Sequence, residues 1–334
     1  MDILNTETLP DGRRVEICRI VTPDATLPED VVRYFIASLG FDYYREYVND
    51  QNYWRLYYRE SLAGRFVPDV IDHHYLARID GEYAARLWFA YSTRTGHGNF
   101  GNVYTEVPFR CLGLMNRLLD HFRADFQTSP ATMLCDGSGS EYAVRSYCRF
   151  GFRLPYGGTT GMICLCKKGS FQKIAAKAFP GREPTAIRPG GIADQFECDK
   201  FRAYTPEMIT FPRQTRLGAA AIISDYRIAF QEVLSGNGVI LVQETPLGEV
   251  PGYAFALRFF GQDILDFGFH LNYLDTLPEL LQKTAVAYQH KFSTSPVCVT
   301  AEGDVERENA LRRASFVEIG GVPGKFRCFS PRFF

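Results

Sequence analysis

A strand that runs directly into a helix, between Val103 and Phe126, constrains this chain more than any other stretch. β-formers alternate at Val103, Thr105 and Val107, and Pro108 then ends the ladder because it has no N–H to donate. The apolar residues that follow have the i, i+4, i+5, i+8 spacing of one buried helical face: Leu114, Leu118, Leu119, Phe122 and Phe126. The pattern predicts a strand that feeds straight into a helix N-terminus.

The turn between this strand and helix, RCLGLM at residues 110–115, is a candidate anion site. Gly113 permits close backbone approach, and the first N–H groups of the following helix have no partner within it. An Arg-x-x-Gly sequence at a strand–helix junction also occurs without any binding role in many α/β proteins. The turn alone therefore leaves both interpretations open.

The segments after this helix favour one interpretation. Residues 131–136 (ATMLCD) predict a short strand, residues 137–140 a flexible connection and residues 141–150 a second helix. Ala143, Tyr147 and Gly151 are spaced by four and four. This order of elements, with R-x-x-G and A-x-x-x-Y-x-x-x-G-F, resembles the GCN5-related N-acetyltransferases, the GNAT superfamily, over about residues 15 to 166.

The resemblance implies a fold, a donor substrate and a set of site residues. The fold is a mixed, mostly antiparallel sheet flanked by helices, with a splayed pair of parallel strands at the cofactor groove. The donor is acetyl-CoA or a short acyl-CoA, without a metal. The resemblance implies that the pyrophosphate binds to the turn, at Arg110, Cys111, Leu112, Gly113, Leu114 and Met115. It also implies that the pantetheine arm lies along the strand at Thr105 and Val107, and that Ser140 at the second helix donates one hydrogen bond. Met115 stands where the family usually has Gly or Ala, so we expect its side chain to crowd the phosphates.

Acyl transfer to an amine needs a base and an acid. An alkyl ammonium group has a pKa near 10 and must lose a proton before its nitrogen attacks the thioester. Glu106, on the strand beside the groove, is the candidate base, although a solvated surface charge is an equal interpretation, and Asp136 is the reserve. The resemblance implies that Tyr147 protonates the departing thiolate, in a direct ternary-complex transfer. A covalent route through Cys111 or Cys135 is less favoured, because neither has a nearby His in the sequence.

An internal repeat predicts a second copy of the domain. The segment from Phe126 to Gly137 recurs 166 residues later from Phe292 to Gly303, with five identical positions and Glu for Asp. We therefore expect an α/β protein of two tandem GNAT folds: a catalytic domain at residues 1–180, a linker at 181–194 and a GNAT-like domain at 195–334.

The second copy lacks the chemical residues of the first. At the same offset the replacements are Thr276 for Arg110, Glu279 for Gly113, Leu281 for Met115, Asn272 for Glu106 and, after a two-residue deletion, Leu311 for Tyr147. An anion at this turn would meet a carboxylate. We expect one acyl-CoA site per chain, in the first copy, and a structural or acceptor-pocket role for the second.

Charge and cysteine content exclude several classes of function. The formal net charge is −1, too low for a nucleic-acid surface, and no run of 18 apolar residues predicts a membrane span. The first residues have no signal-peptide pattern, so we expect a cytoplasmic protein, a monomer or homodimer, whose nine cysteines are free thiols. Cys164 and Cys166 lack the further ligands of a zinc site.

Other segments carry weaker signals. An aromatic-rich helix at residues 41–58 is a candidate acceptor surface, although core packing explains it as well. His73 and His74 are interpreted as a loop, and residues 93–102 as a long hairpin connection. The remaining predictions are strands at residues 15–20, 75–79 and 159–165 and helices that begin near Pro28 and span residues 171–178.

The sequence thus favours an N-acyltransferase that acetylates a primary amine of a small molecule. Two alternatives remain. A non-catalytic acyl-CoA sensor would keep the turn and lose turnover. An acyl or aminoacyl transferase that uses another carrier, such as an aminoacyl-tRNA, is disfavoured by the near-neutral charge.

Overall fold

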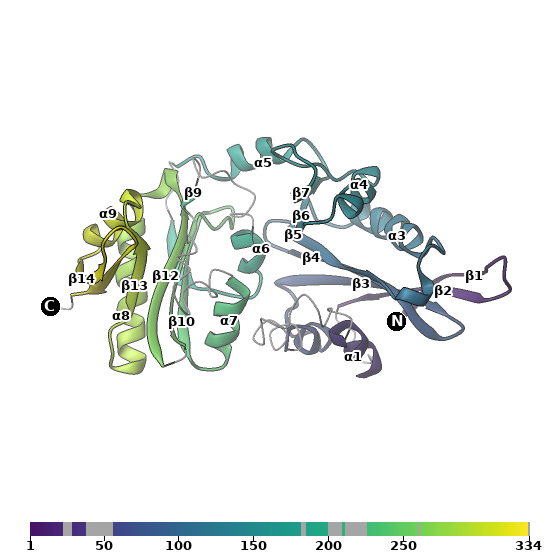
Figure 1. The fold of residues 1–334 in the computed structure, drawn as a ribbon, viewed down its shortest axis with the longest axis horizontal. Coiled ribbons are helices and arrows are strands. Elements are labelled where there is room, and N and C mark those ends of the chain that lie inside the picture. Colours follow the sequence, from purple (N-terminus) through teal and green to yellow (C-terminus); the bar gives the residue numbers. More distant parts are fainter. Residues whose placement is uncertain are drawn as a thin grey trace. The chain divides into compact units, whose positions relative to one another are not determined.

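The computed structural model describes residues 1–22, 29–37, 56–181, 185–199, 209–210, 226–259 and 261–332. They form two compact units, Met1–Gln172 and Lys173–Phe334. Each unit has its own mixed sheet with flanking helices (Figure 1). The prediction of an α/β protein with two such sheets is confirmed.

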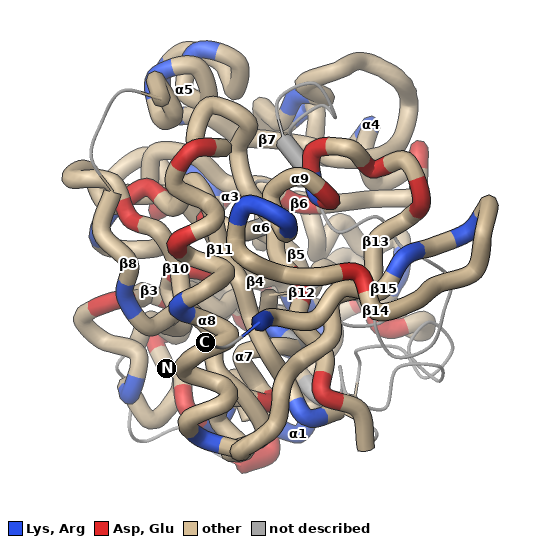
Figure 2. The backbone as a smooth tube through the Cα atoms, turned by 90° about the vertical axis from the view of Figure 1, so that its left-hand side faces the viewer, with Lys and Arg blue, Asp and Glu red and all other residues tan. Residues whose placement is uncertain are grey.

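Charges of both signs are interspersed along the described chain (Figure 2). None of the helices in the described ranges combines the length and the apolar character needed to cross a membrane.

The sheet of the first unit has seven strands in the order β1-β2-β3-β4-β5-β6-β7. All neighbouring strands are antiparallel except β5 and β6, which are parallel. A helical segment also covers residues 56–62. The other elements are β1 (Asp2–Thr8), β2 (Arg14–Val21), α1 (Glu29–Ala37), β3 (Val70–Ile79), β4 (Glu82–Ser92), β5 (His97–Thr105), α3 (Leu114–Thr128), β6 (Met133–Ser138), α4 (Glu141–Arg149) and β7 (Gly161–Cys166).

Helices cover both faces of this sheet (Figure 1). On one face Phe122 of α3 packs on Phe89 of β4, with ring centroids 5.3 Å apart. On the other face Phe35 of α1 packs on His74 of β3 at 5.1 Å. Neighbouring residues of a strand point to opposite faces of the sheet. Because both faces are covered, β3 and β4 are buried almost continuously instead of alternating between buried and exposed residues.

Three local predictions are corrected. His73 and His74 lie within β3, not in a loop, because the strand begins at Val70 and burial lowers the pKa of both imidazoles and keeps them neutral. The connection predicted for residues 93–102 is much shorter, since β5 begins at His97. Within β5, residue 98 must be glycine, because a Cβ at this position would lie only 1.9 Å from the Ala90 carbonyl oxygen. Glu106 follows β5 instead of lying on it, because Pro108 turns Val107–Phe109 into a 3₁₀ turn.

The junction between the units also differs in part from the prediction. The helix predicted at residues 171–178 is confirmed as α5 (Phe171–Ala178). The first compact unit ends at Gln172 and the second begins at Lys173, whereas the predicted catalytic domain extends to residue 180. Within the predicted linker 181–194 lies β8 (Ala186–Pro189), which pairs antiparallel with β10 and so belongs to the second sheet.

The sheet of the second unit has the order β14-β15-β13-β12-β11-β10-β8, and β9 pairs separately with β12. Helices α8 and α7 pack on opposite faces, α8 on the alanines of β11 and α7 on Tyr253. Its elements after β8 are α6 (Asp194–Asp199), β9 (Ile209–Thr210), α7 (Tyr226–Leu234), β10 (Gly238–Glu244), β11 (Gly252–Phe259), β12 (Gln262–His270), α8 (Leu277–Phe292), β13 (Val297–Ala301), α9 (Val305–Arg313), β14 (Phe316–Val322) and β15 (Phe326–Pro331).

The two units share the order of elements around one strand junction. In each, a strand ends in a 3₁₀ turn, a long helix follows, and the next strand lies parallel to the first: β5, α3 and β6 in one unit, and β12, α8 and β13 in the other. A nine-residue helix, α4 or α9, comes next. This correspondence agrees with the two copies that the sequence repeat predicts.

The junction of the second unit is filled by a buried ion pair. Arg307 is the third residue of α9, and Ala143 is the third residue of α4. The Arg307 guanidinium donates to a carboxylate oxygen of Asp266 and, over 2.6 Å, to the carbonyl oxygen of Phe267, both on β12 just beyond its pairing with β13. Arg307 and Asp266 are 2% and 7% exposed. The space beside β12 is therefore occupied by the protein's own side chain.

Removing this cation should destabilise the second unit. We expect Arg307→Met to cost about 3–5 kcal/mol, because Asp266 is left buried without its partner. Burial raises the pKa of Asp266, so the loss should shrink as the pH falls through this raised pKa, because the unpaired carboxyl of the folded variant then takes up a proton and no longer buries a charge. Hydrogen exchange of α9 and β13 measures the effect. Arg312→Met, on the exposed side of α9, is the matched control, with an expected cost of at most about 1 kcal/mol. Equal protection in the two variants would show that the pair contributes nothing.

Candidate functional site

A β-bulge bends β5 near the middle of the first sheet. Arg86 of β4 lies opposite Tyr104, whereas Trp88 lies opposite Gly101, so β5 has one more residue than β4 between these pairs. The extra residue is accommodated at Asn102, whose backbone is left-handed with φ 53°. Its side-chain amide donates to the hydroxyl of Tyr58, which ties the bulge to the helical segment at residues 56–62.

The pairing of β5 with β6 ends just before the bulge. The two strands pair in parallel over three residue pairs, the last of which is Asn99 with Cys135. β5 then continues to Thr105 and β6 to Ser138, and no backbone pairing joins these parts within the described residues. The prediction of parallel strands that splay apart is confirmed. The edge of β5 from Phe100 onward is open to the amides of an extended ligand.

The candidate turn follows directly at the end of β5. Cys111 and Gly113 both have left-handed backbones, with φ 64° and 73°, and Gly113 is the N-cap residue of α3. The first N–H groups of α3, like those of any helix, have no intrahelical acceptor, and glycine offers no side chain to cap them. Left-handed and helical residues in succession form a backbone concavity that suits an anion. The sequence prediction of an anion-binding geometry at residues 110–115 thus has a matching backbone.

Buried side chains and one arginine support this turn. Leu114 is buried, and Leu112 and Met115 pack against the same core. Met115 is partly buried against this core, which argues against its crowding the phosphates, and that expectation stays a prediction. Arg117, which the sequence reasoning missed, donates to the carbonyl oxygen of Leu112 over 2.9 Å and pairs with Glu7 of β1. A Cβ on Gly113 would lie 2.8 Å from its Nη1, which is the movable end of a flexible side chain, so the left-handed backbone at φ 73° favours glycine here more than this contact does.

Arg110 is folded back onto the end of β5. Its Nε donates to the carbonyl oxygen of Thr105 over 3.1 Å, and its guanidinium lies 5.8 Å from the centre of the Tyr104 ring. Val107, in the 3₁₀ turn, is 64% exposed. The cationic head of Arg110 thus stands at the end of the open strand edge, and Cys111 beside it is exposed.

On α4, Tyr147 faces the junction of β5 and β6. Its ring packs at 5.3 Å from Phe100 and at 5.9 Å from Phe152. Burial and the nearby Asp136 carboxylate raise the pKa of Tyr147 above its usual value, so the phenol keeps its proton near neutral pH. Ser140 is the N-cap of α4, and its hydroxyl oxygen accepts from the backbone N–H of Ala143 over 3.3 Å. Asp136 therefore lies on the Tyr147 side of the junction.

Glu106 belongs to the opposite face of the sheet. Its half-buried carboxylate acts electrostatically on Tyr34 of α1 and on Arg86 of β4. The structure thus separates the two candidate bases: Asp136 lies near Tyr147, and Glu106 lies toward α1.

That face of the sheet carries polar residues that the sequence reasoning missed. Asp72 of β3 is fully buried, and its carboxylate accepts from Tyr57 over 2.8 Å, from Ser61 over 2.6 Å and from Trp88 Nε1 over 2.7 Å. Tyr57 and Ser61 belong to residues 56–62, so Asp72 fixes this helical segment to β3 and β4. Residues 41–55 of the predicted aromatic acceptor helix lie outside the described residues.

His74 and Arg86 continue this polar layer. His74 is fully buried between Phe35 and Tyr58, and no described residue forms a hydrogen bond with either ring nitrogen. Burial lowers the pKa of His74 to about 3, so the ring is neutral. Arg86 is 2% exposed, and its guanidinium lies 5.5 Å from the centre of the Phe35 ring. Asp72 and His74, like Arg86 and Trp88, are two residues apart, the spacing at which side chains share one face of a strand. This spacing in the sequence could have identified the polar face.

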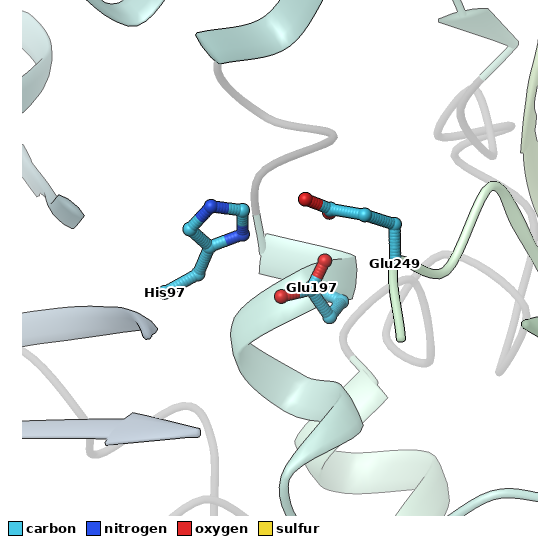
Figure 3. A group of neighbouring side chains, drawn as sticks. All are labelled: His97, Glu197 and Glu249. Carbon is cyan, nitrogen blue, oxygen red and sulfur yellow. The ribbon is translucent and has the colours of Figure 1, made fainter. Parts of the chain in front are cut away.

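Two further carboxylates belong to the second unit. Glu197 lies on α6 and Glu249 in the turn between β10 and β11, and carboxylate oxygens of the two lie within 4.8 Å of each other (Figure 3). They are 1% and 8% exposed. Taken singly, neither unit brings three potential metal ligands this close among its described residues, so no metal centre is assigned.

Comparisons with known proteins match the chain to solved structures alone. No family model matches it, and neither does a curated protein. The acyl-CoA N-acyltransferase of Pseudomonas aeruginosa is 19% identical over 45% of this chain and 99% of its own, with a TM-score of 0.32. The PaiA N-acetyltransferase of Thermoplasma acidophilum, in complex with coenzyme A, is 13% identical over 46% and 98%, with a TM-score of 0.34. A GNAT-family protein of Desulfovibrio desulfuricans is 19% identical over 45% and 100%, also with a TM-score of 0.34.

Proposed function

We propose that the first unit transfers an acetyl or short acyl group from acyl-CoA to a primary amine of a small molecule. The observation that carries this proposal is the open edge of β5, which leads directly into the left-handed turn at the N-terminus of α3. An extended chain of amides that ends in a pyrophosphate has the matching chemistry, and the pantetheine and phosphate portions of acyl-CoA form such a chain.

In this proposal, the backbone holds the donor. The N–H groups of residues 111–115 bind the pyrophosphate, where no side chain at Gly113 obstructs them. The open edge of β5, with Thr105 and Val107, pairs with the pantetheine amides. Arg110 adds a positive charge at the junction of these two parts. Ser140 has its oxygen committed to the cap of α4, so any contribution to the donor comes from its hydroxyl proton.

The acceptor reaches the thioester from the face that carries Glu106. A primary ammonium group with a pKa near 10 must be deprotonated, and Glu106 is the carboxylate at the end of β5 on this side. The Glu106 carboxylate accepts this proton directly or through one intervening water. Attack then gives a tetrahedral intermediate, whose oxyanion accepts from a backbone N–H near Val107.

Tyr147 assists departure of the thiolate. Its raised pKa keeps the phenol protonated, so its O–H can donate a hydrogen bond to the sulfur as charge develops. The same raised pKa makes the phenol a weak acid, so we assign hydrogen-bond donation as its main contribution and proton transfer as a later step.

The second unit is proposed to bind no acyl-CoA. Its counterpart of the turn is the first helical turn of α8, where Glu279 forms an ion pair with Lys283 over 2.7 Å. Its counterpart of the open strand edge is occupied by Arg307. A phosphate and a pantetheine arm would both meet protein groups there.

The central test counts acyl-CoA sites and removes the turn. We expect calorimetric titration of the full chain to give one site for acetyl-CoA. Gly113→Glu and Gly113→Gln impose the same strain at φ 73° and the same contact with Arg117, and they differ in one charge. Affinity should fall at least about tenfold further for Glu than for Gln, which corresponds to about 1.4 kcal/mol. A carboxylate favours a helix N-terminus, so unfolding cannot explain this difference. Two equivalent sites, or equal affinities of the two variants, would contradict the proposal.

Removing the Tyr147 hydroxyl should slow turnover without weakening donor binding. Tyr147→Phe keeps the ring contacts with Phe100 and Phe152. We expect kcat for thiol release from acetyl-CoA, measured with a panel of primary amines, to fall about 10²-fold while the Kd of acetyl-CoA is unchanged. Because the pKa of Tyr147 is raised, wild-type activity should show no loss from its ionisation below about pH 10. An unchanged kcat with chemistry rate-limiting would restrict Tyr147 to a packing role.

Asp72 should affect the acceptor and leave the donor alone. Asp72→Asn weakens the bonds that hold residues 56–62, at a cost of about 1–3 kcal/mol, so we expect the KM of the acceptor to rise about tenfold and the Kd of acetyl-CoA to stay constant. Asp125→Asn is the matched control. That carboxylate binds Arg19 and Tyr75 on the α3 face, so its loss should reduce stability without changing the acceptor KM. If the wild type, Asp72→Asn and Asp125→Asn have the same acceptor KM, Asp72 has no role in acceptor binding.

A further inference from the structure

Two cysteines of the first unit lie directly opposite each other on adjacent strands. Cys135 of β6 is the register partner of Cys164 of β7, and their sulfur atoms are 3.2 Å apart. Both thiols are buried, at 2% and 3% exposure. Among the described residues, no other two cysteines are joined in this way.

The backbone geometry at this pair suits a covalent bond. The N–H and C=O of Cys164 both bond to Arg153 on the other side of β7, each over 2.8 Å. Cys135 and Cys164 are therefore a non-hydrogen-bonded pair of the antiparallel ladder, in which opposite Cα atoms lie about 4.5 Å apart. That separation falls within the range of about 4.4–6.8 Å that disulfides span.

We propose that Cys135 and Cys164 form an oxidisable dithiol that closes to a cross-strand disulfide with a low-molecular-weight disulfide. One thiolate attacks a sulfur of the small disulfide and expels the first small thiol. The other cysteine then attacks the mixed disulfide, the protein S–S bond forms, and a second small thiol leaves. Two protein thiols are oxidised, and one disulfide is reduced to two thiols.

The position of the pair sets the rate and the consequence of this reaction. The hydrogen bond with Cys135 and burial raise the pKa of Cys164, and both thiols are buried, so attack requires a local opening of β7. β7 is the last strand of its sheet, and at Cys164 its outer side is held by the isolated bridge to Arg153, so opening must break these two hydrogen bonds. The two cysteines are 29 positions apart in the sequence, so the disulfide would close a loop that contains α4 and Tyr147. It would also join β6 to β7 at the residue where β6 leaves β5.

Oxidised glutathione is the probe for this dithiol. The reduced full chain is incubated with it, quenched with acid, alkylated and digested. We expect a linkage between the peptides of Cys135 and Cys164, no glutathione retained on these two peptides, faster formation at higher pH, and a raised unfolding midpoint of the oxidised protein. Cys166, two residues along β7, is the competing partner, and a Cys135–Cys166 linkage would overturn the assignment.

Single variants separate the dithiol from ordinary thiol oxidation. Cys135→Ser and Cys164→Ser should each retain one glutathione on the remaining cysteine, because no opposite thiol is present to release it. Cys148→Ser, a half-buried position on α4, is the control and should form the wild-type linkage. Peptide mapping of the unmodified chain decides the proposal even if a serine variant is unstable. Absence of the Cys135–Cys164 linkage in that sample would refute it.

Discussion

The limited pairing between β5 and β6 determines the arrangement of the first unit around its candidate site. Parallel pairing stops after Asn99, and the bulge at Asn102 then bends β5 before the 3₁₀ turn at Val107–Phe109 delivers the chain to α3. Among the described residues, one side of β5 beyond Asn99 pairs with no strand, and the chain then leads into a helix without a side-chain cap. Backbone donors and acceptors that the fold does not use are costly unless water or a ligand satisfies them. The same irregularities that shorten the sheet therefore underlie the proposed binding edge.

The second unit shows how little is needed to close such a junction. Its strands also pair over a short stretch, yet the third residue of α9 is Arg307, where α4 has Ala143. A guanidinium reaches across to β12 and satisfies the carbonyl oxygen of Phe267, a position that a ligand amide could otherwise take. Asp266 neutralises the charge. Small residues at this helix position keep the junction open, and a long cation fills it.

The sequence predicted the elements that follow simple periodicity and missed those that depend on buried polar groups. The apolar spacing from Leu114 to Phe126, together with Pro108 and Gly113, was sufficient to predict the strand–turn–helix motif. The sequence placed His73 and His74 in a loop before a strand, because a polar pattern gives no sign that burial keeps both rings neutral. The direction of Met115 also depends on the core beneath it, which spacing alone does not describe.

The two faces of the first sheet differ in how much polar chemistry they bury, and this contrast bears on the acceptor. The face under α3 is mainly an apolar core of aromatic and aliphatic side chains, with His73 and the Asp125–Arg19 ion pair as its polar members. The face under α1 buries a carboxylate, an imidazole and a guanidinium at Asp72, His74 and Arg86. Buried polar groups add little stability compared with apolar residues of the same size. A requirement for stability alone would favour the same apolar composition on both faces. The polar layer is instead explained if this face must orient a polar acceptor beside Glu106, with Asp72 holding residues 56–62 in place.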